Sequence, residues 1–371
     1  MTRSLPPVDV VVSGGGIVAA AIALELARRD LSVELVSRGR AGRPSGPGGP
    51  VAAQAGPGGP EALADLALLS RHLFSDWVSA LEEETGLPCE YDERGAMSVA
   101  FDEKGEMAID RALDAQRARG LHFEVLDAEE ARGREPALSP ALHAVFAFPR
   151  DGVARAGRIG RALVLAARGA GVRLREGAAA EAVGVSAGRV SGLETSAGLV
   201  PAEAVVLAGR GGPGAVAGAP RLRLGLAPRA WLRLDAAADP DRPTRLLRSP
   251  EACLVPRRDG SLVAFATAPA DVAASRPRVR GAAQLFGALE RLVPASREWL
   301  AERVGASVEH GAPDGLPVLG EAGTDGLLLA AGWGGDELLL APAAAAVVAD
   351  LVTGRVPPLA AAPFSPSRLG A

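Results

Sequence analysis

Three consecutive glycines near the N-terminus carry the clearest chemical signal in the sequence. Gly14, Gly15 and Gly16 stand between a β-branched aliphatic run and an Ala/Leu-rich run. At such a strand-to-helix turn, the Gly-x-Gly-x-x-Gly pattern lets the backbone approach a pyrophosphate, which the helix N-terminus then stabilises. Ala19 occupies the third glycine position, which the pattern accepts. The motif predicts a dinucleotide site, and the alternative is a glycine-rich turn that binds no nucleotide.

The end of the following strand decides how a ribose would be held. Dinucleotide sites usually place an acidic residue there, which accepts hydrogen bonds from the ribose hydroxyls. Here that position is Ser37, while Glu34 lies inside the strand and is expected to point elsewhere. A serine can still hydrogen-bond a ribose hydroxyl, but it loses a charge-assisted bond that is roughly twice as strong.

The other chemically active side chains form no recognisable metal or nucleophile pattern. The two cysteines, Cys89 and Cys253, have neither a disulfide framework nor zinc spacing. The histidines also lack the spacing of metal ligands; they are His72, His122, His143 and His310. We therefore expect no metal site, and unpaired cysteines suit a reducing compartment.

The composition argues against several classes of protein. The chain has 371 residues, 48% hydrophobic and 23% charged, which suits two domains, or one large α/β unit with an insertion, rather than a disordered chain. The net charge is −4 and no stretch forms a basic block, so nucleic acid is not expected as a partner. The longest apolar run, residues 338–349, is shorter than the ~20 residues of a membrane span. Because the N-terminus shows no signal-peptide pattern, a cytoplasmic location is expected.

Apolar periodicity and turn residues predict the elements that would position these groups. Helices are expected at residues 17–29, 61–84, 103–119, 155–168, 281–292 and 338–352. Strands are expected at residues 8–12, 31–36, 172–176, 181–185, 189–195, 205–208, 230–235, 252–255, 261–267 and 326–331. A loop dense in glycine and proline covers residues 39–60.

This order of elements predicts an α/β fold, with a Rossmann-like dinucleotide-binding domain and an inserted, strand-rich α+β domain. We expect the dinucleotide-binding domain to be discontinuous and to comprise residues 1–85, 152–225 and 314–371. The inserted domain, which would form a cap over a substrate, is expected at residues 86–151 and 226–313.

Three further segments have recognisable sequences: DGVARAGRIGRALVLAARGAGVRL (151–174), HGAPDGLPVLG (310–320) and LLLAAGWGGDELLLAPAAAAVVADLVTG (327–354). With the N-terminal glycines, their order and spacing resemble the D-amino acid oxidase superfamily of FAD-dependent oxidoreductases, nearest to glycine oxidase and sarcosine oxidase. The resemblance implies a non-covalent FAD and oxidation of the C–N bond of a small amine or amino acid by hydride transfer to the flavin. It also implies a link with thiamine biosynthesis, which glycine oxidase serves in bacteria.

The resemblance assigns roles to individual positions. Gly14, Gly16 and Ala19 would line the pyrophosphate, Ser37 would face the adenosine ribose, and Ala182 would lie near the adenine. The turn that contains Gly332 and Gly334 would approach the flavin ring, and the helix that begins at Leu338 would direct its N-terminal dipole toward it.

The sequence departs from the family pattern where the chemistry would occur. The substrate arginine of the family aligns with Glu309, and like-charge contact with a substrate carboxylate would be unfavourable. A tyrosine before the VPR motif (255–257) aligns with Cys253. Other departures are Ala230-Trp231 for a Gly-Gln pair, Phe265 for a strand glycine, Trp333 for a polar residue and Gly335 for a basic one.

Two explanations fit these departures. In the first, the protein is an active flavoenzyme with an altered pocket: Glu309 binds a cationic amine, His310 serves as an acid or base, Arg257 replaces the carboxylate clamp, and Trp333 and Trp231 form apolar walls. In the second, the protein is a degenerate or repurposed relative, a non-catalytic flavin-binding or structural partner. Either protein could form a homo-oligomer or join a second kind of subunit.

Overall fold

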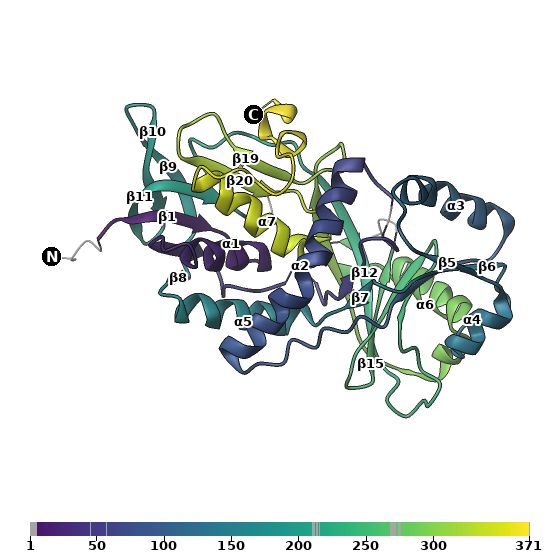
Figure 1. Cartoon of the computed structure of the whole chain (residues 1–371). Coiled ribbons are helices and arrows are strands. Elements are labelled where there is room, and N and C mark those ends of the chain that lie inside the picture. The colour runs from purple at the N-terminus through teal and green to yellow at the C-terminus, as the bar shows by residue number, and fades with distance from the viewer. Residues whose placement is uncertain are drawn as a thin grey trace.

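The computed structural model describes residues 6–44, 46–56, 58–209, 212, 214, 216–267, 272–273 and 276–370. Two eight-stranded sheets organise these residues and lie side by side along the molecule (Figure 1). The chain passes between the sheets several times, so each sheet is assembled from stretches that are far apart in the sequence.

The first sheet carries the N-terminal strand at its centre. Its order is β19-β20-β11-β1-β2-β8, with the β9–β10 hairpin added to β11. The strands from β20 to β8 are parallel, and β19 is antiparallel to β20. The bounds are β1 Val8–Ser13, β2 Val33–Ser37, β8 Arg173–Glu176, β9 Ala180–Ser186, β10 Arg189–Thr195, β11 Gly198–Leu207, β19 Val318–Glu321 and β20 Leu327–Ala331.

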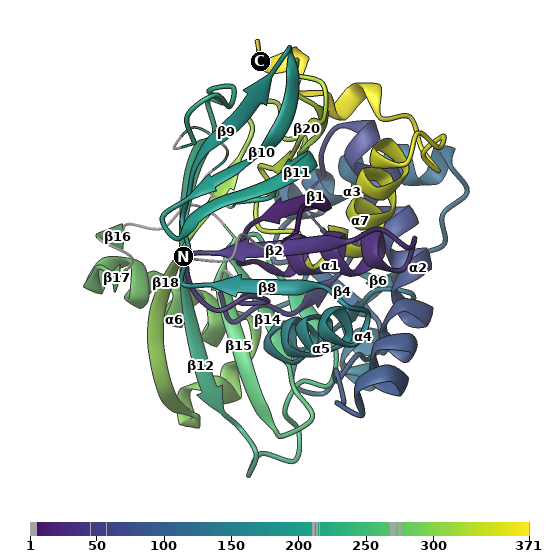
Figure 2. The same cartoon turned by 90° about the vertical axis from the view of Figure 1, so that its left-hand side faces the viewer.

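Four helices gather on one side of this sheet (Figure 2). They are α1 Ile17–Ala27, α2 Glu61–Thr85, α5 Ala156–Gly169 and α7 Glu337–Val352. The helices α1 and α7 are rich in alanine and buried on almost every face, because small side chains let neighbouring helices approach closely. Among the described residues no helix is both long and apolar enough to cross a membrane.

The second sheet has the order β18-β12-β15-β14-β13-β4-β6-β5. Its strands are β4 Ala96–Ala100, β5 Glu124–Leu126, β6 Ala144–Phe148, β12 Gly225–Asp235, β13 Leu246–Arg248, β14 Ala252–Pro256, β15 Ser261–Ala266 and β18 Leu300–Gly311. Its helices are α3 Glu103–Ala118, α4 Ala128–Arg134 and α6 Val279–Leu292. Short strands pair as β3 Pro50–Val51 with β7 Gly152–Val153, and as β16 Val272–Ala273 with β17 Arg276–Pro277.

Alternation along these strands gives the second sheet two different faces. One face, with Leu232 and Leu254, packs against Leu285 and Leu289 of α6. The opposite face, which includes Cys253 and Val255, packs toward α3 and the loop before α2. Every second residue of β12 to β15 is therefore directed toward the first sheet and the glycine-rich loop.

The expected α/β class and the strand–glycines–helix–strand start are confirmed. The predicted helices and strands form, with ends that differ by a few residues; β11 and β12 are longer than expected. The elements that the sequence patterns missed include β13, β18, β19 and α4. The first five residues of β18 are all exposed and so show no alternation, whereas Asp127 and Glu130 form a capping box at α4 that could have revealed that helix. The domain boundaries given above stay a prediction.

A buried carboxylate ties the loop before α2 to the turn between β6 and β7. Asp151 is fully buried and accepts hydrogen bonds from the backbone N–H groups of Ala53, Gln54 and Ala55, the last at 2.6 Å. Its Oδ1 also lies 2.8 Å from a guanidinium nitrogen of Arg71 on α2. Three backbone donors and a cation therefore fix the loop against both sheets.

Replacing this carboxylate tests its structural role. Asp151→Asn keeps the shape of the side chain but leaves the buried Arg71 without its counter-ion. We expect the free energy of unfolding, measured by urea titration, to fall by about 3 kcal/mol. The matched control is Asp110→Asn, which removes the exposed ion pair with Arg117 and should change stability very little. Equal stability of the two variants would show that Asp151 does not hold the loop.

Candidate active site

The glycine turn between β1 and α1 forms an open cradle. A Cβ atom on Gly14 would lie 2.6 Å from the carbonyl oxygen of Ala208 and 2.9 Å from Cβ of Ala19, so the strand end and the helix pack without room for a side chain. A Cβ on Gly16 would have no heavy atom within 4 Å, because that side of the turn faces open space. The helix α1 has no side-chain cap and no acidic residue in its first turn, so its N-terminal dipole is available to an anion.

Beside this cradle lies a hollow, here called the ribose hollow, whose lining includes Gly15, Ser37, Arg38 and Arg40. Ser37 ends β2 and is only 2% exposed. Among the described residues its Oγ has no hydrogen-bond partner, which is unusual for a buried hydroxyl. A bound hydroxyl would satisfy this oxygen, in agreement with the expectation for Ser37.

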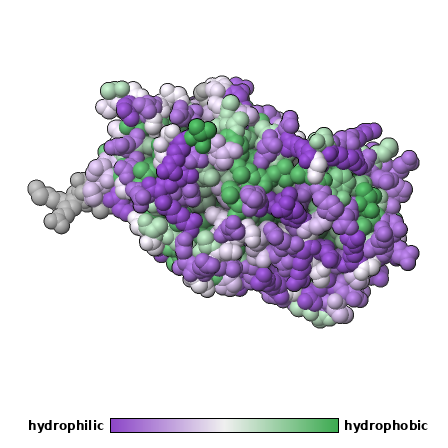
Figure 3. Space-filling view, in the orientation of Figure 1, coloured by the Kyte–Doolittle hydropathy of each residue, from purple (hydrophilic) through white to green (hydrophobic). Residues whose placement is uncertain are grey.

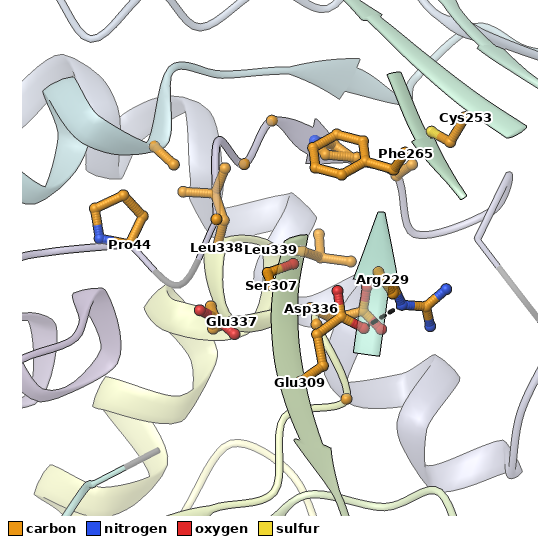
Figure 4. A pocket seen from close by; sticks show the side chains of 18 of the residues that line it. Pro44, Arg229, Cys253, Phe265, Ser307, Glu309, Asp336, Glu337, Leu338 and Leu339 are labelled. Carbon is orange, nitrogen blue, oxygen red and sulfur yellow. Dashed lines mark hydrogen bonds and ion pairs between the residues drawn. The ribbon is translucent and has the colours of Figure 1, made fainter. Parts of the chain in front are cut away.

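A second hollow, here called the Glu309 pocket, continues from the first and shares Ile17 and Glu337 with it (Figure 4). Its side toward the first sheet is formed by the loop at residues 46–52 and by the turn before α7, including Gly334, Gly335 and Leu338. The described residues place Gly334 and Gly335 in the left-handed region at φ 62° and 102°, which lets the turn fold back toward β18. The backbone N–H of Gly334 donates to the carbonyl of His310 at 2.9 Å.

The opposite side of the Glu309 pocket is one face of the second sheet. Arg229 of β12, Arg248 of β13, Cys253 of β14, Phe265 of β15 and Glu309 of β18 all line it. Strand alternation brings them to this face, because their neighbours Ala230, Leu247, Leu254 and Ala264 belong to the opposite core. The sequence patterns had indicated Cys253, Phe265 and Glu309, whereas Arg229 lies just before the strand expected at residues 230–235 and Arg248 lies in β13, where no strand was expected.

Glu309 forms the centre of the polar group in this pocket. Nε of Arg229 donates to Oε2 of Glu309 from the neighbouring strand, where Arg229 stands opposite Ser307 and so diagonally across from Glu309 (Figure 4). Burial raises the pKa of Glu309 to about 7, although Arg229 opposes the shift. Asp336 and Glu337 lie near enough to raise this pKa further.

Gly335 and Glu309 are complementary departures from the family pattern. A Cβ on Gly335 would lie 2.6 Å from the carboxyl carbon of Glu309, so this carboxylate occupies the space that a side chain at position 335 would need. The basic residue expected at 335 and the arginine expected at 309 are thus replaced together. The result is a pocket in which an acidic side chain fills the place of two cationic ones.

Arg248 supplies a cation on the other side of the pocket. Its side chain lines the Glu309 pocket next to Cys253, and its charge lowers the pKa of Asp336, which burial raises. Among the described residues the guanidinium of Arg248 has no hydrogen bond or salt bridge, whereas Arg229 is bonded to Glu309 and to the carbonyl of Thr267. Arg248 is therefore the guanidinium available to an anionic ligand.

Three residues expected in the pocket lie elsewhere. His310 follows Glu309 on β18, and alternation turns its side chain to the other face. Arg257 and Trp231 line a neighbouring hollow rich in arginine, which shares Pro44 and Gly46 with the Glu309 pocket; Arg257 donates to the carbonyl of Pro47, and Trp231 covers Gly305. Burial and the neighbouring Arg155 lower the pKa of Arg257 to about 10. These positions correct the expectation that Arg257 replaces the clamp.

The remaining expected residues are distributed as follows. Trp333 is 7% exposed and lines the ribose hollow rather than the substrate side of the Glu309 pocket. Gly332 is buried behind the turn, and Ala182 lies in β9 outside both hollows, so its place near an adenine stays a prediction. No group of three or more His, Cys, Asp or Glu side chains suited to a metal ion occurs in the described part of the chain.

A dinucleotide cradle that leads into a polar pocket is typical of nucleotide-dependent oxidoreductases. The comparisons with known proteins identify the family. The chain belongs to the family of FAD-dependent oxidoreductases, whose sequence pattern it matches over residues 9–351. It is 32% identical over 374 residues to a glycine oxidase of Geobacillus kaustophilus, covering 97% of both chains. The crystal structure of glycine oxidase from that organism superposes with a TM-score of 0.89, at 28% identity, over 97% of this chain and 98% of the other.

A longer relative shares the same region. The chain is 32% identical over 366 residues to the bifunctional protein ThiO/ThiG of Synechocystis sp., which covers 97% of this chain but 54% of that protein. The chain thus spans about half the length of the first curated relatives that it matches.

The residues present fit FAD. The open cradle at Gly16, the uncapped N-terminus of α1 and the unsatisfied Oγ of Ser37 suit a pyrophosphate and a ribose. The side chain of Asp336 does not cap α7, so the backbone N–H groups at the start of that helix are not taken by a side-chain cap, although Glu337 places an acidic residue in its first turn. Cys253 is the cysteine nearest to this end; burial raises the pKa of its thiol, which disfavours the thiolate and accords with a non-covalent flavin.

A glycine substitution tests the cradle. Gly14→Ala would press a methyl group against the carbonyl of Ala208, a backbone atom that cannot turn away. We expect the dissociation constant of FAD, measured by fluorescence titration of the apoprotein, to rise by about tenfold or more. Gly287→Ala on α6, where a Cβ meets no atom within 4 Å, is the control. Unchanged FAD affinity in Gly14→Ala, with far-UV circular dichroism like the wild type, would exclude the cradle as the binding site.

Proposed function

We propose that this protein oxidises the C–N bond of an amino acid, with FAD as the electron acceptor. The observation that carries the proposal is the Glu309 pocket, which places a carboxylate and a separate guanidinium against the N-terminus of α7. Bound FAD would supply the chemistry by accepting two electrons from the substrate. The side chains of this chain would bind, orient and deprotonate the substrate.

Glu309 would receive the amino group of the substrate. An amine must lose its ammonium proton before its C–H bond can be oxidised, because the nitrogen lone pair stabilises the developing positive charge. Glu309, with a pKa of about 7, could accept this proton at Oε1 while Arg229 holds Oε2. The carboxylate thus has a role opposite to that of the family's arginine.

Arg248 would bind the substrate carboxylate. It is the guanidinium of the pocket that has no partner among the described side chains, and it lies on β13, which β15 and β14 separate from Arg229 on β12. A carboxylate on Arg248 and an amino group on Glu309 would orient the carbon between them. This arrangement moves the anchor from Arg257, the residue favoured by sequence reasoning, to Arg248.

The alternative of a non-catalytic relative is not favoured, since the cradle, the turn before α7 and a polar pocket are all retained. The link with thiamine biosynthesis, a cytoplasmic location and any association with itself or a second subunit stay predictions.

The pH dependence of flavin reduction tests the role of Glu309. Below about pH 7 the raised pKa keeps Glu309 protonated and unable to accept a proton, so the second-order rate of reduction by an amino acid should rise as the pH passes 7. The groups facing Glu309 are Arg229, Asp336 and Glu337, with Arg248 across the pocket. In Glu309→Gln the second-order rate of flavin reduction, measured by anaerobic stopped flow, should be about 100-fold lower and should show no inflection near pH 7.

The raised pKa of Glu309 should also make the free energy of unfolding depend on pH. Because the folded-state pKa of Glu309 exceeds the ordinary glutamate pKa of 4.5, the contribution of Glu309 to the free energy of unfolding is present below pH 4.5 and is lost as the pH rises through 7. The free energy of unfolding of Glu309→Gln, measured by urea titration, should not show this decrease as the pH rises through 7. An inflection near pH 7 that persists in Glu309→Gln would assign it to another group.

Substrate charge tests Arg248. Arg248→Gln should raise the KM for amino acids by about tenfold or more, and it should change the KM much less for amines that lack a carboxylate. Arg248→Lys should recover part of the loss. Arg303→Gln, in the neighbouring arginine-rich hollow, is the matched control. An equal rise in KM for amines with and without a carboxylate would exclude Arg248 as the anchor.

A further inference from the structure

A groove opens from the Glu309 pocket toward α3, and nothing in the proposed chemistry uses it. This α3 groove has a volume of about 530 Å³ and shares five lining residues with the Glu309 pocket: Ala52, Gly56, Arg248, Asp336 and Leu339. The two spaces therefore meet at Arg248 and Asp336, where the carboxylate end of a substrate would lie. The side chain of a substrate whose carboxylate is held by Arg248 could extend directly into the groove.

Small apolar residues create this space. Ala108, Ala112 and Ala115 stand at helical spacing along one side of α3 and line the groove. The opposite wall is the loop before α2, where a Cβ on Gly58 would lie 3.6 Å from Cβ of Ala112. Larger residues at either wall would close the gap between them.

The floor of the groove offers few free polar groups to a ligand. Phe148 of β6 is almost fully buried there, and Ser98 of β4 lines the groove beside it, because the side chain of Val99 belongs to the core on the opposite face of the sheet. The two amides in the lining satisfy one another: Nε2 of Gln54 donates to Oε1 of Gln116 at 3.1 Å, and Nε2 of Gln116 donates to the carbonyl of Gln54 at 3.0 Å. Few polar groups are left to favour a hydrated ligand.

The view in Figure 3 shows apolar surface between the upper part of α2 and α3, whereas the outer surface of α3 is mostly hydrophilic. Charged residues of α3 that would oppose an apolar ligand lie outside the groove lining; Asp110 and Asp114 are paired with Arg117 on the exposed side of the helix. Arg111 is the charged residue of α3 that lines the groove, and its side chain is exposed.

We infer that the α3 groove binds the side chain of the substrate, and that the preferred substrates are 2-amino acids with an unbranched or branched apolar side chain of several carbons rather than glycine. The inference rests on the proposed function, because Arg248, the proposed anchor of the substrate carboxylate, lies where the Glu309 pocket and the α3 groove meet. Glycine would leave the groove unfilled, whereas each added methylene would bury apolar surface between the alanines of α3 and the loop before α2.

The test uses the FAD-loaded full chain and a series of racemic linear 2-amino acids from glycine to norleucine. Anaerobic flavin reduction gives the affinity for each amino acid, and reoxidation by oxygen is measured separately. We expect the affinity to increase by about fourfold for each methylene. Ala112→Phe should reduce this gradient so that norleucine loses more than tenfold relative to glycine. Ala118→Phe, exposed on the same helix outside the groove, is the control and should keep the wild-type gradient.

The wild-type gradient does not depend on any variant, so the inference stays testable if Ala112→Phe folds poorly. Equal affinity for glycine and norleucine in the wild type would overturn the inference and leave the proposed function intact. Slower reoxidation without a change in reduction by Ala112→Phe would assign the groove to the electron acceptor and would also overturn it. Flavin that no amino acid reduces would instead refute the proposed function.

Discussion

The buried carboxylate of Asp151 is the constraint on which the candidate site depends. It accepts hydrogen bonds from three successive backbone N–H groups of the loop before α2 and pairs with Arg71. All four donor nitrogens lie within 3.3 Å of its carboxylate oxygens. Such a group costs free energy to bury and is stabilised only when its lone pairs are satisfied. The loop it holds lines the Glu309 pocket at Ala52 and the α3 groove at Ala53, so one interaction fixes the wall shared by both spaces.

The chemistry of the pocket follows from a redistribution of charge. Glu309 takes the space beside Gly335 and is paired with Arg229, while Arg248 of β13 brings a guanidinium that has no partner in the described part of the chain. The departures from the family pattern therefore do not amount to a loss of polar groups. They exchange the positions of acid and cation, and the pocket retains one group suited to an amino group and one suited to a carboxylate.

The fold could be predicted from the sequence because the elements of the first sheet and its helices carry local signals: the glycine turn, the aliphatic strands and the alanine-rich helices. Only some residues of the Glu309 pocket could be predicted from the sequence. Glu309 and Cys253 were identified because they interrupt a family pattern, and Arg229 and Arg248 were missed because their place depends on strand pairing far along the chain. Arg257 was favoured for its neighbourhood in sequence, but it follows the last residue of β14 and lines the arginine-rich hollow instead.

Product analysis tests the central claim most directly. The FAD-loaded protein is titrated without oxygen with a 2-amino acid, and both the flavin absorbance and the 2-oxo acid in solution are quantified. Removal of two electrons and two protons from the amino acid gives an imine, which water converts to the 2-oxo acid and ammonia. The account predicts complete loss of the oxidised flavin absorbance and one 2-oxo acid for each flavin. A flavin that stays oxidised with every amino acid tested, or that is reduced without forming a 2-oxo acid, would contradict it.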